Sequence, residues 1–390
     1  MDKQNPSSRN VSRRAFLGTM GAAAATLALA GCSGSPASSS AAASSAASSA
    51  AESASAAASA SAAASAAAET PEVSKINWAR ANSGNIFVTL GQQKGYFADY
   101  GLEVIENPVQ NDTDAMASLS SGKVDVTSNQ GTVTPLQNIA AGEDFTIVGG
   151  YMLQGMYMVA KKGAIDYKGP ESLVGKKIAH KAPQIPVLYA LDQIGEPFDS
   201  VTWVQTDTGA DRLTAAIAGE ADLGYLSGDL LFQVQQNPEV EIVVYADELM
   251  PAYGCCRMNM RTDFVKQNPT TVKLLLKALL RAEAYFQANK DEAVEILAKE
   301  LNTTPEFCAA YLKNEHYKIS IDPVRKRVLN SWDIMKKAKM VEGKAAETDV
   351  ESHIDVSFYK AALDEVIAEH GDEYPEWWED RKKFFEEYNV

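Results

Sequence analysis

Cysteine and histidine are scarce in this sequence, with four of each in 390 residues. Disulfide scaffolds and zinc modules depend on closely spaced sets of these residues, whereas the histidines here are widely separated. The sequence also lacks the H-E-x-x-H, G-x-S-x-G, phosphate-loop and G-x-G-x-x-G patterns. We therefore expect no metal site, no cofactor and no enzyme activity.

Basic residues are also fewer than acidic residues. The chain has 36 Lys and Arg against 51 Asp and Glu, which gives a net charge of −15. Residues 1–31 contribute +3, so the remaining residues carry −18. A body this acidic repels nucleic acid and anionic lipid headgroups over about one Debye length. We expect no nucleic-acid partner, and contact with a membrane requires a separate anchor.

Residues 1–31 have the layout of an export signal. Arg13 and Arg14 stand directly before an apolar run from Ala22 to Ala30, as in twin-arginine signals. Gly18 occupies a place where those signals usually have a basic residue, so the twin-arginine and general secretory routes both stay open. The apolar run is too short to span a bilayer in the mature protein.

The signal ends in Leu29-Ala30-Gly31-Cys32, which resembles the lipobox of bacterial lipoproteins. The resemblance implies that Cys32 is lipidated, becomes the first residue and anchors the protein to the outer face of the cytoplasmic membrane. The alternative is a plain signal peptide with a chance cysteine. Residues 33–68 are almost entirely Ser and Ala and have no large side chain for a core. We interpret residues 32–72 as the lipidated cysteine and a linker.

From about Val73 the sequence alternates between apolar, strand-like runs and helical stretches. Such alternation is typical of mostly parallel sheets flanked by helices, and it occurs in two rounds. The pattern therefore predicts an α/β fold with two lobes and a helical C-terminal part. Strands are expected at residues 76–81, 102–105, 124–127, 145–148, 177–180, 201–205, 222–225 and 241–245, and long helices at 271–288 and 291–301.

Polar loops follow several of these strands. Ligands of open α/β sheets lie beyond the carboxyl ends of the strands, where loops lead into helix N-termini. Asn, Gln and Tyr side chains there can supply directional hydrogen bonds and a stacking face. Arg80, in the first strand, is the cation nearest to these loops in the sequence. The candidate ligand-binding residues are Arg80, Asn82, Ser83, Asn85, Asn129, Gln130, Thr132, Gln184, Tyr225, Ser227 and Asp229.

Several motifs resemble one family of transport proteins. The run Gly91-Gln92-Gln93-Lys94-Gly95-Tyr96-Phe97, followed by Gly101-Leu102, looks like a segment of the nitrate/sulfonate/taurine and thiamine-precursor binding proteins of ABC importers. The similarity continues at Ser121–Val126, Leu173–Ala179, Ala218–Asp222 and Asp263–Pro269.

This resemblance implies a two-lobed periplasmic-binding-protein fold of type II, with two crossover strands. Residues 73–160 and 256–390 would form lobe I and residues 161–255 lobe II, with hinges at Met158–Lys162 and Ala252–Arg257. The implied protein is an extracytoplasmic monomer that binds a nitrate-, sulfonate- or taurine-like compound. It would deliver this small molecule to an ABC permease in the membrane.

Two departures keep another ligand class open. The loop leading into the second lobe contains Pro183 and Pro186, which lack the N–H that an anion would use. No Arg lies in the candidate loops, and Asn77-Trp78 resembles the pyrimidine-binding relatives, although a Trp buried in the core is the other and preferred interpretation of Trp78. A pyrimidine or another thiamine precursor is therefore the alternative ligand.

Two further protein classes resemble the same pattern. A receptor that senses a ligand without transporting it would share every feature above. A synthase of the thiamine-pyrimidine type is disfavoured, because such enzymes are intracellular and have a site rich in cysteine and histidine. This chain has only the pair Cys255-Cys256, which we interpret as two small strand residues rather than a disulfide.

Replacing Cys32 with Ser tests the anchor. The Cys32→Ser protein should be released into the medium, because it can no longer accept a lipid, and its affinity for ligand should not change. Fractionation of cells and immunoblotting measure the distribution. Persistent membrane attachment of the variant would refute the lipid tether.

Overall fold

The computed structural model describes residues 69–81 and 83–390. The predicted signal peptide, Cys32 and the Ser/Ala spacer lie outside the described residues, and so does the candidate ligand residue Asn82. Within the described ranges, no helix has both the length and the apolar character needed to cross a bilayer.

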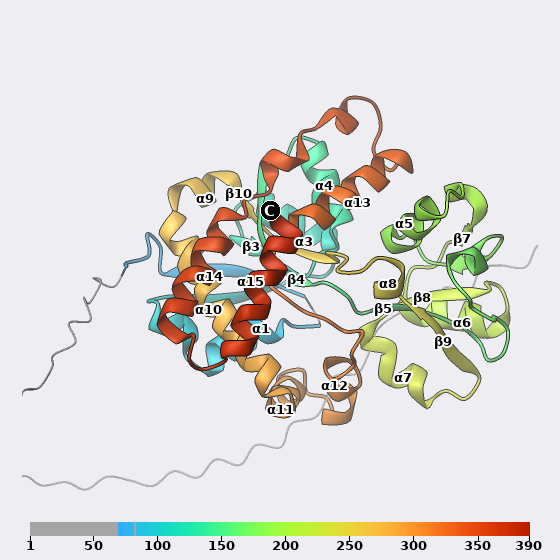
Figure 1. The fold of residues 1–390 in the computed structure, drawn as a ribbon, viewed down its shortest axis with the longest axis horizontal. Coiled ribbons are helices and arrows are strands. Elements are labelled where there is room, and N and C mark those ends of the chain that lie inside the picture. Colours follow the sequence, from blue (N-terminus) through green and yellow to red (C-terminus); the bar gives the residue numbers. More distant parts are fainter. Residues whose placement is uncertain (1–68, 82) are drawn as a thin grey trace, which may run out of the picture. The chain divides into compact units, whose positions relative to one another are not determined.

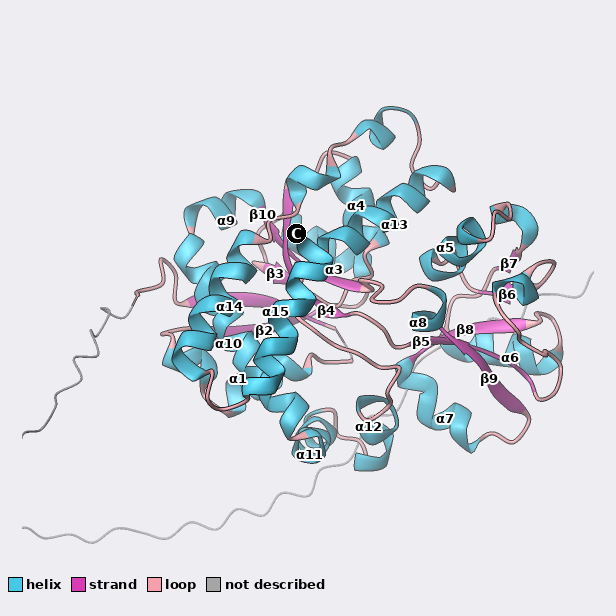
Figure 2. Ribbon diagram, in the orientation of Figure 1, coloured by secondary structure: helices cyan, strands magenta, loops and turns pink. Residues whose placement is uncertain are grey.

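The first sheet has five strands in the order β2-β1-β3-β10-β4 (Figures 1 and 2). β1 is parallel to β2 and β3, whereas β10 runs antiparallel between β3 and β4. Ile76 and Trp78 of β1 and Val126 of β3 are fully buried, as expected for a sheet covered by helices. The strands are β1 (Lys75–Arg80), β2 (Glu103–Pro108), β3 (Val126–Thr127), β4 (Phe145–Met152) and β10 (Cys256–Arg261).

The helices between these strands include α1. The end of α1 begins the Gly91–Phe97 motif, which resembles the transport-protein family. Gly91 lies in α1 without room for a side chain, because a Cβ there would stand 2.5 Å from the ring of Phe97. This close approach packs α2 against α1 and explains why the motif joins a glycine to an aromatic residue. The helices are α1 (Ile86–Gln93), α2 (Tyr96–Asp99), α3 (Asp112–Ser120) and α4 (Val133–Ala140).

The second sheet repeats the arrangement in the order β7-β6-β8-β5-β9 (Figure 2). β6 is parallel to β7 and β8, while β5 runs antiparallel between β8 and β9. The predicted α/β class is therefore confirmed. The strands are β5 (Met156–Lys161), β6 (Lys177–Ala179), β7 (Thr202–Val204), β8 (Leu223–Ser227) and β9 (Val240–Tyr245). The helices are α5 (Ile185–Gln193), α6 (Gly209–Ala218), α7 (Leu231–Gln236) and α8 (Ala246–Leu249), with 3₁₀ turns at Pro170–Leu173, Phe198–Ser200 and Gly228–Leu230.

Two segments connect the sheets: residues 153–155 join β4 to β5, and residues 246–255 join β9 to β10. The predicted first hinge, Met158–Lys162, is wrong, because residues up to Lys161 belong to β5 and pair with β9 in the second sheet. The apolar residues of β5 continue the second sheet as an interior strand, so the chain crosses earlier, at 153–155. The lobe limits at residues 160 and 256 stay predictions.

The C-terminal part is helical, as predicted (Figure 1). Leu275, Leu276, Leu279 and Leu280 of α10 are fully buried in the core of the first sheet. Trp378, which is 2% exposed, joins the same core from α15. The elements are α9 (Thr262–Gln267), α10 (Pro269–Ala288), α11 (Lys290–Glu300), α12 (Pro305–Leu312), α13 (Arg325–Lys337), α14 (Ser357–His370) and α15 (Pro375–Asn389), with 3₁₀ turns at Gly343–Glu347 and Val350–His353.

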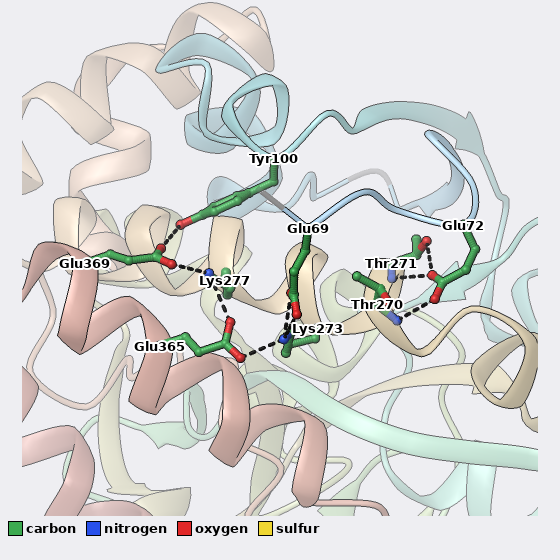
Figure 3. Close-up of polar contacts among 9 residues, drawn as sticks. All are labelled: Glu69, Glu72, Tyr100, Thr270, Thr271, Lys273, Lys277, Glu365 and Glu369. Atoms are coloured by element: carbon green, nitrogen blue, oxygen red, sulfur yellow. Dashed lines mark hydrogen bonds and ion pairs between the residues drawn. The ribbon is translucent and has the colours of Figure 1, made fainter. Parts of the chain in front are cut away.

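Glu72, among the first described residues, is hydrogen-bonded to the start of α10 (Figure 3). Glu72 accepts hydrogen bonds from the backbone N–H groups of Thr270 (3.0 Å) and Thr271 (2.7 Å), and from the Thr271 hydroxyl (2.9 Å). A carboxylate at a helix N-terminus satisfies free N–H groups and opposes the positive end of the helix dipole. Burial opposes its ionisation, but these hydrogen bonds outweigh burial and lower the pKa of Glu72 to about 2.

Two lysines of α10 lie among glutamates in the same region (Figure 3). Lys273 Nζ lies 2.7 Å from a carboxylate oxygen of Glu69 and 2.6 Å from one of Glu365. Lys277 Nζ lies 3.1 Å from Glu365 and 2.6 Å from Glu369. These ion pairs join α10 to α14 and to the first described residues.

Removing the Glu72 carboxylate should destabilise the protein in a way that depends on pH. Glu72→Ala should lower the free energy of unfolding by about 1 kcal/mol at pH 7, as for other lost helix caps. Because the folded-state pKa is depressed, this contribution is fully present above the ordinary pKa of 4.5 and is lost as pH falls through about 2. The free energies of unfolding of the wild type and of Glu72→Ala should therefore become equal in acid.

Urea unfolding at neutral pH and in acid measures both values. Glu69→Ala, which removes only an exposed ion pair, is the control and should cost less. An equal gap between wild type and Glu72→Ala at every pH would contradict the cap.

Candidate ligand-binding site

Asn85 is placed at the carboxyl end of β1, where it caps α1. Its Oδ1 accepts hydrogen bonds from the backbone N–H groups of Phe87 (3.0 Å) and Val88 (3.5 Å). Its Nδ2 donates to Ser128 Oγ (3.0 Å), at the end of the neighbouring strand β3. The N–H of Ile86 donates to the Tyr151 hydroxyl (3.4 Å). The first N–H groups of α1 are therefore all engaged within the protein.

Asn129 and Thr132 tie three loops of the first sheet together. Asn129 Nδ2 donates to the Gly84 carbonyl at 2.7 Å and reaches Ser83 Oγ at 3.5 Å. Thr132, which is fully buried, donates its backbone N–H to the Cys255 carbonyl at 2.6 Å. Its hydroxyl donates to the carbonyls of Gly254 and Cys255. Residues 83–85, 128–132 and 254–256 thus form one hydrogen-bonded group, which we call the loop cluster.

Gln184 and Tyr225 meet around His180 in the second sheet. Gln184 Nε2 lies 2.8 Å from His180 Nδ1 and 3.1 Å from the Ala182 carbonyl. The rings of His180 and Tyr225 pack edge to face with their centroids 5.7 Å apart. Burial, followed by the neighbouring Arg212 guanidinium, lowers the pKa of His180 to about 4, so this imidazole is neutral at pH 7.

The two remaining candidates of the second sheet pair with each other. Ser227, at the end of β8, donates its hydroxyl to the carboxylate of Asp229, which is exposed. Tyr225, two residues earlier on β8, is fully buried. The turn after β8 therefore presents a hydroxyl and a carboxylate that already share a hydrogen bond.

Two candidates have buried polar atoms without a partner. Among the described residues, nothing donates to Oε1 of Gln130, which is 1% exposed, and nothing pairs with the hydroxyl of the fully buried Tyr225. An unsatisfied buried polar group costs roughly 1–3 kcal/mol, so such groups call for a partner from water or from a ligand. Within the candidate loops, these two atoms are therefore places where a water molecule or a ligand can complete a hydrogen bond.

Arg80 is occupied by carboxylates. Its guanidinium lies 2.9 Å from Glu300 and 3.6 Å from Glu106, and Glu300 also accepts a hydrogen bond from Thr89. Burial raises the pKa of Glu106, and the nearby Arg80 opposes this shift. The predicted cation is therefore a partner of the protein's own acids, outside the loop cluster.

Sequence reasoning missed three contributors. His180 ends the strand-like run 177–180 directly before a candidate loop, which could have marked it. Cys255 and Cys256 join the loop cluster from the start of β10, although they lie far away in the sequence. Tyr317 packs against the turn after β8, since a Cβ on Gly228 would lie 3.1 Å from its ring. No local pattern indicates the last two contacts.

Among residues 69–81 and 83–390, no group of three or more His, Cys, Asp or Glu is arranged to hold a metal ion. Besides the Cys255 and Cys256 thiols, the site offers hydrogen bonding by amides and hydroxyls, together with aromatic packing. Amides, hydroxyls and aromatic rings bind small polar molecules through non-covalent contacts.

The hydroxyl of Thr132 should be required for the loop cluster. Thr132→Val keeps the shape of the side chain but leaves the Gly254 carbonyl without this donor, so the free energy of unfolding should fall by about 1–3 kcal/mol. Thr113→Val, at an exposed position of α3, is the matched control and should change it by less than about 0.5 kcal/mol. Denaturant unfolding measures both variants, and equal stabilities would contradict the role of Thr132.

Comparison with known proteins agrees with this fold. The periplasmic aliphatic sulphonate-binding protein of Escherichia coli is 17% identical, with a TM-score of 0.59 over 70% of this chain and 90% of that one. The periplasmic nitrate-binding protein of Synechocystis PCC 6803 is 15% identical, with a TM-score of 0.61 over 76% of this chain and 90% of that one. The chain therefore has the fold of periplasmic binding proteins.

One sequence relative is an enzyme. The 4-amino-5-hydroxymethyl-2-methylpyrimidine phosphate synthase of Saccharomyces cerevisiae is 25% identical over 271 residues, which cover 63% of this chain and 78% of the yeast protein. A family model described as NMT1/THI5 like matches residues 82–293. Because this match spans more than half of the 390 residues, the chain belongs to the NMT1/THI5-like family.

Proposed function

We propose that this protein is an exported solute-binding protein, anchored through Cys32, that delivers a small molecule to an ABC importer. The observation that carries the proposal is the repeated placement of polar side chains at the carboxyl ends of parallel strands in both sheets. In the first sheet these side chains include Asn85 and Asn129, and in the second Gln184 and Tyr225. Open α/β sheets bind ligands at these ends.

Binding would work through closure of two lobes around the ligand. The connections at residues 153–155 and 246–255 are the proposed hinges, because they are the segments that join one sheet to the other. A ligand that contacts both lobes favours the closed form by its difference in affinity for the two forms. The permease would recognise the closed form, and the protein would act as a monomer.

The first ligand class we propose is a nitrate-, sulfonate- or taurine-like compound. Two structural neighbours are named for binding a sulphonate and nitrate. The Gln and Tyr side chains at the site can donate hydrogen bonds to the oxygens of such compounds.

A pyrimidine or a related thiamine precursor is the second candidate, and the engaged N–H groups favour it. The N–H groups of Ile86, Phe87 and Val88 have partners within the protein, and Arg80 is paired with acids. An anion would therefore find neither a free helix N-terminus of α1 nor this free guanidinium. The neutral His180 and its aromatic surroundings suit an uncharged ring.

We propose binding without a reaction. The yeast relative is a synthase, but its 25% identity leaves the activity of this chain as a separate question. The predicted export signal and the Ser/Ala spacer fit a protein that meets its ligand outside the cytoplasm. A receptor that senses the same ligand without transport is the remaining rival, and copurification with a permease or with a kinase separates the two.

Native mass spectrometry of freshly purified protein should reveal a carried-over small molecule. Titration with nitrate, taurine, an alkanesulfonate and an aminopyrimidine should then raise the melting temperature for one class. Gln184→Ala should weaken binding about tenfold, since about 1.4 kcal/mol of hydrogen bonding is lost. Gln193→Ala, at the exposed end of α5, should bind like wild type.

Two outcomes would contradict the proposal. A ligand that binds but leaves with a changed mass would make the protein an enzyme. An unchanged melting temperature across the panel, with no carried-over molecule, would exclude the proposed ligand classes.

A further inference from the structure

Cys255 and Cys256 are free thiols at the start of β10, where the chain enters the first sheet from the second. Their sulfur atoms lie 3.8 Å apart, and the S–H of Cys256 is placed to donate to the sulfur of Cys255. Cys255 is partly exposed, whereas Cys256 is 6% exposed. Cys255 is therefore the more accessible residue of the pair, and the sulfur of Cys256 lies close enough to resolve a mixed disulfide formed on it.

The two cysteines also belong to the loop cluster. The Cys255 carbonyl accepts the backbone N–H of Thr132 at 2.6 Å, and Cys256 Sγ lies 3.5 Å from the Asn129 carbonyl. Gly131 and Cys256 form an isolated antiparallel bridge. Any change in the backbone at the cysteine pair is consequently transmitted to residues 129–132.

The surroundings activate the outer thiol. The pKa of the Cys255 thiol is lowered, first by the hydrogen bond from Cys256 and then by the nearby Arg257 guanidinium, although burial opposes the shift. The thiolate is the form that attacks a disulfide. The same hydrogen bond raises the pKa of Cys256, which therefore suits the role of the second, resolving thiol.

We propose that Cys255 and Cys256 form a redox-sensitive dithiol, a modification site that small-molecule disulfides convert to an intramolecular disulfide. The Cys255 thiolate attacks one sulfur of the oxidant R–S–S–R, forms a mixed disulfide and releases one R–S⁻. The Cys256 thiolate then attacks the Cys255 sulfur, forms the Cys255–Cys256 bond and releases the second R–S⁻. Two thiols of the protein are oxidised, and one R–S–S–R is reduced to two R–SH after proton uptake.

Oxidation must reshape the backbone at this point. The Cα atoms of neighbouring residues are about 3.8 Å apart across a trans peptide, whereas disulfides usually join Cα atoms about 4.4–6.8 Å apart. The sulfurs, now 3.8 Å apart, must also approach to about 2.05 Å. Because the trans peptide fixes that Cα–Cα distance, the eight-membered ring can close only if the backbone torsions around the Cys255–Cys256 peptide change, and we expect the Cys255 carbonyl to turn away from Thr132.

This geometry distinguishes the pair from the remaining described cysteine. Cys308 is fully buried, and the Tyr311 hydroxyl lies 3.8 Å from its sulfur. Among the described residues, no second thiol pairs with Cys308 to resolve a mixed disulfide. The proposed oxidation does not rest on the proposed function.

Mass spectrometry tests the oxidation on the full chain. After reduction with dithiothreitol and then exposure to glutathione disulfide, the proteolytic peptide that contains Cys255 and Cys256 should lose two hydrogen atoms and resist alkylation. Dithiothreitol should restore two alkylatable thiols. Because the measurement is made on this peptide, Cys32 does not interfere, and Cys308→Ser serves as a control that should oxidise like wild type.

Hydrogen exchange tests the transmitted change without any ligand. The amide of Thr132 should exchange about tenfold faster in the oxidised protein, because it loses its acceptor. Cys256→Ser should stop at the mixed disulfide of Cys255, and Cys255→Ser should not react.

Three results would overturn the proposal. They are two alkylatable thiols in the peptide after oxidation, a stable glutathione adduct in the wild type, and an oxidised protein whose Thr132 amide exchanges as slowly as before. None of them bears on whether the protein binds a solute. If oxidation and exchange behave as expected but no panel ligand binds, the solute-binding proposal fails alone.

Discussion

The site depends on the antiparallel course of β10 through the first sheet. β10 lies between β3 and β4, so its first residues stand beside the carboxyl end of β3. This placement brings Cys255 and Cys256 to Thr132, although more than a hundred residues separate them. If β10 ran parallel to β3, its start would lie at the opposite edge of the sheet and the loop cluster could not form.

A buried charge fixes the start of β10. Arg257 is fully buried, and its guanidinium donates to the carbonyls of Asp322 (2.6 Å) and Met152 (2.9 Å). Gly150 is needed opposite this side chain, because a Cβ there would collide with the guanidinium. Burial lowers the pKa of Arg257 to about 10, which still leaves it charged at neutral pH. A buried cation held by carbonyls costs stability when any partner is lost, so the strand is held in one position.

The segment between α12 and α13 supplies one of those carbonyls. Asp322 accepts hydrogen bonds from the Val324 N–H (2.8 Å) and from Asn389 Nδ2 (2.8 Å), near the end of α15. These two hydrogen bonds fix the position of the segment whose carbonyl accepts a hydrogen bond from Arg257. The C-terminal helical part, which side-chain periodicity predicts from the sequence, therefore helps to position β10, the strand that completes the loop cluster.

The sequence predicts the parts of this structure that depend on local pattern. All eight strands expected from apolar runs exist, and the long helix at 271–288 matches α10 within a few residues, because side-chain periodicity is a local property. The ion pair between Arg80 and Glu300 could not be predicted, because Glu300 lies 220 positions away in the sequence. The hinge error at Met158 has the same origin, because pairing between distant strands decides where β5 begins.

The side chains at the site differ in whether their hydrogen-bonding groups already have partners, and this difference bears on which ligands the site can bind. In the first sheet, Asn85, Asn129 and Thr132 already have partners, so their hydrogen bonds hold the loops rather than wait for a ligand. Gln130 Oε1 and the Tyr225 hydroxyl have no partner in the part of the chain that the structure describes. A buried amide accepts a hydrogen bond through its oxygen or, after rotation by 180°, donates one through its nitrogen. In the orientation of this structure, Gln130 Oε1 suits the ammonium group of taurine or the amino group of a pyrimidine, whereas nitrate requires the rotated amide.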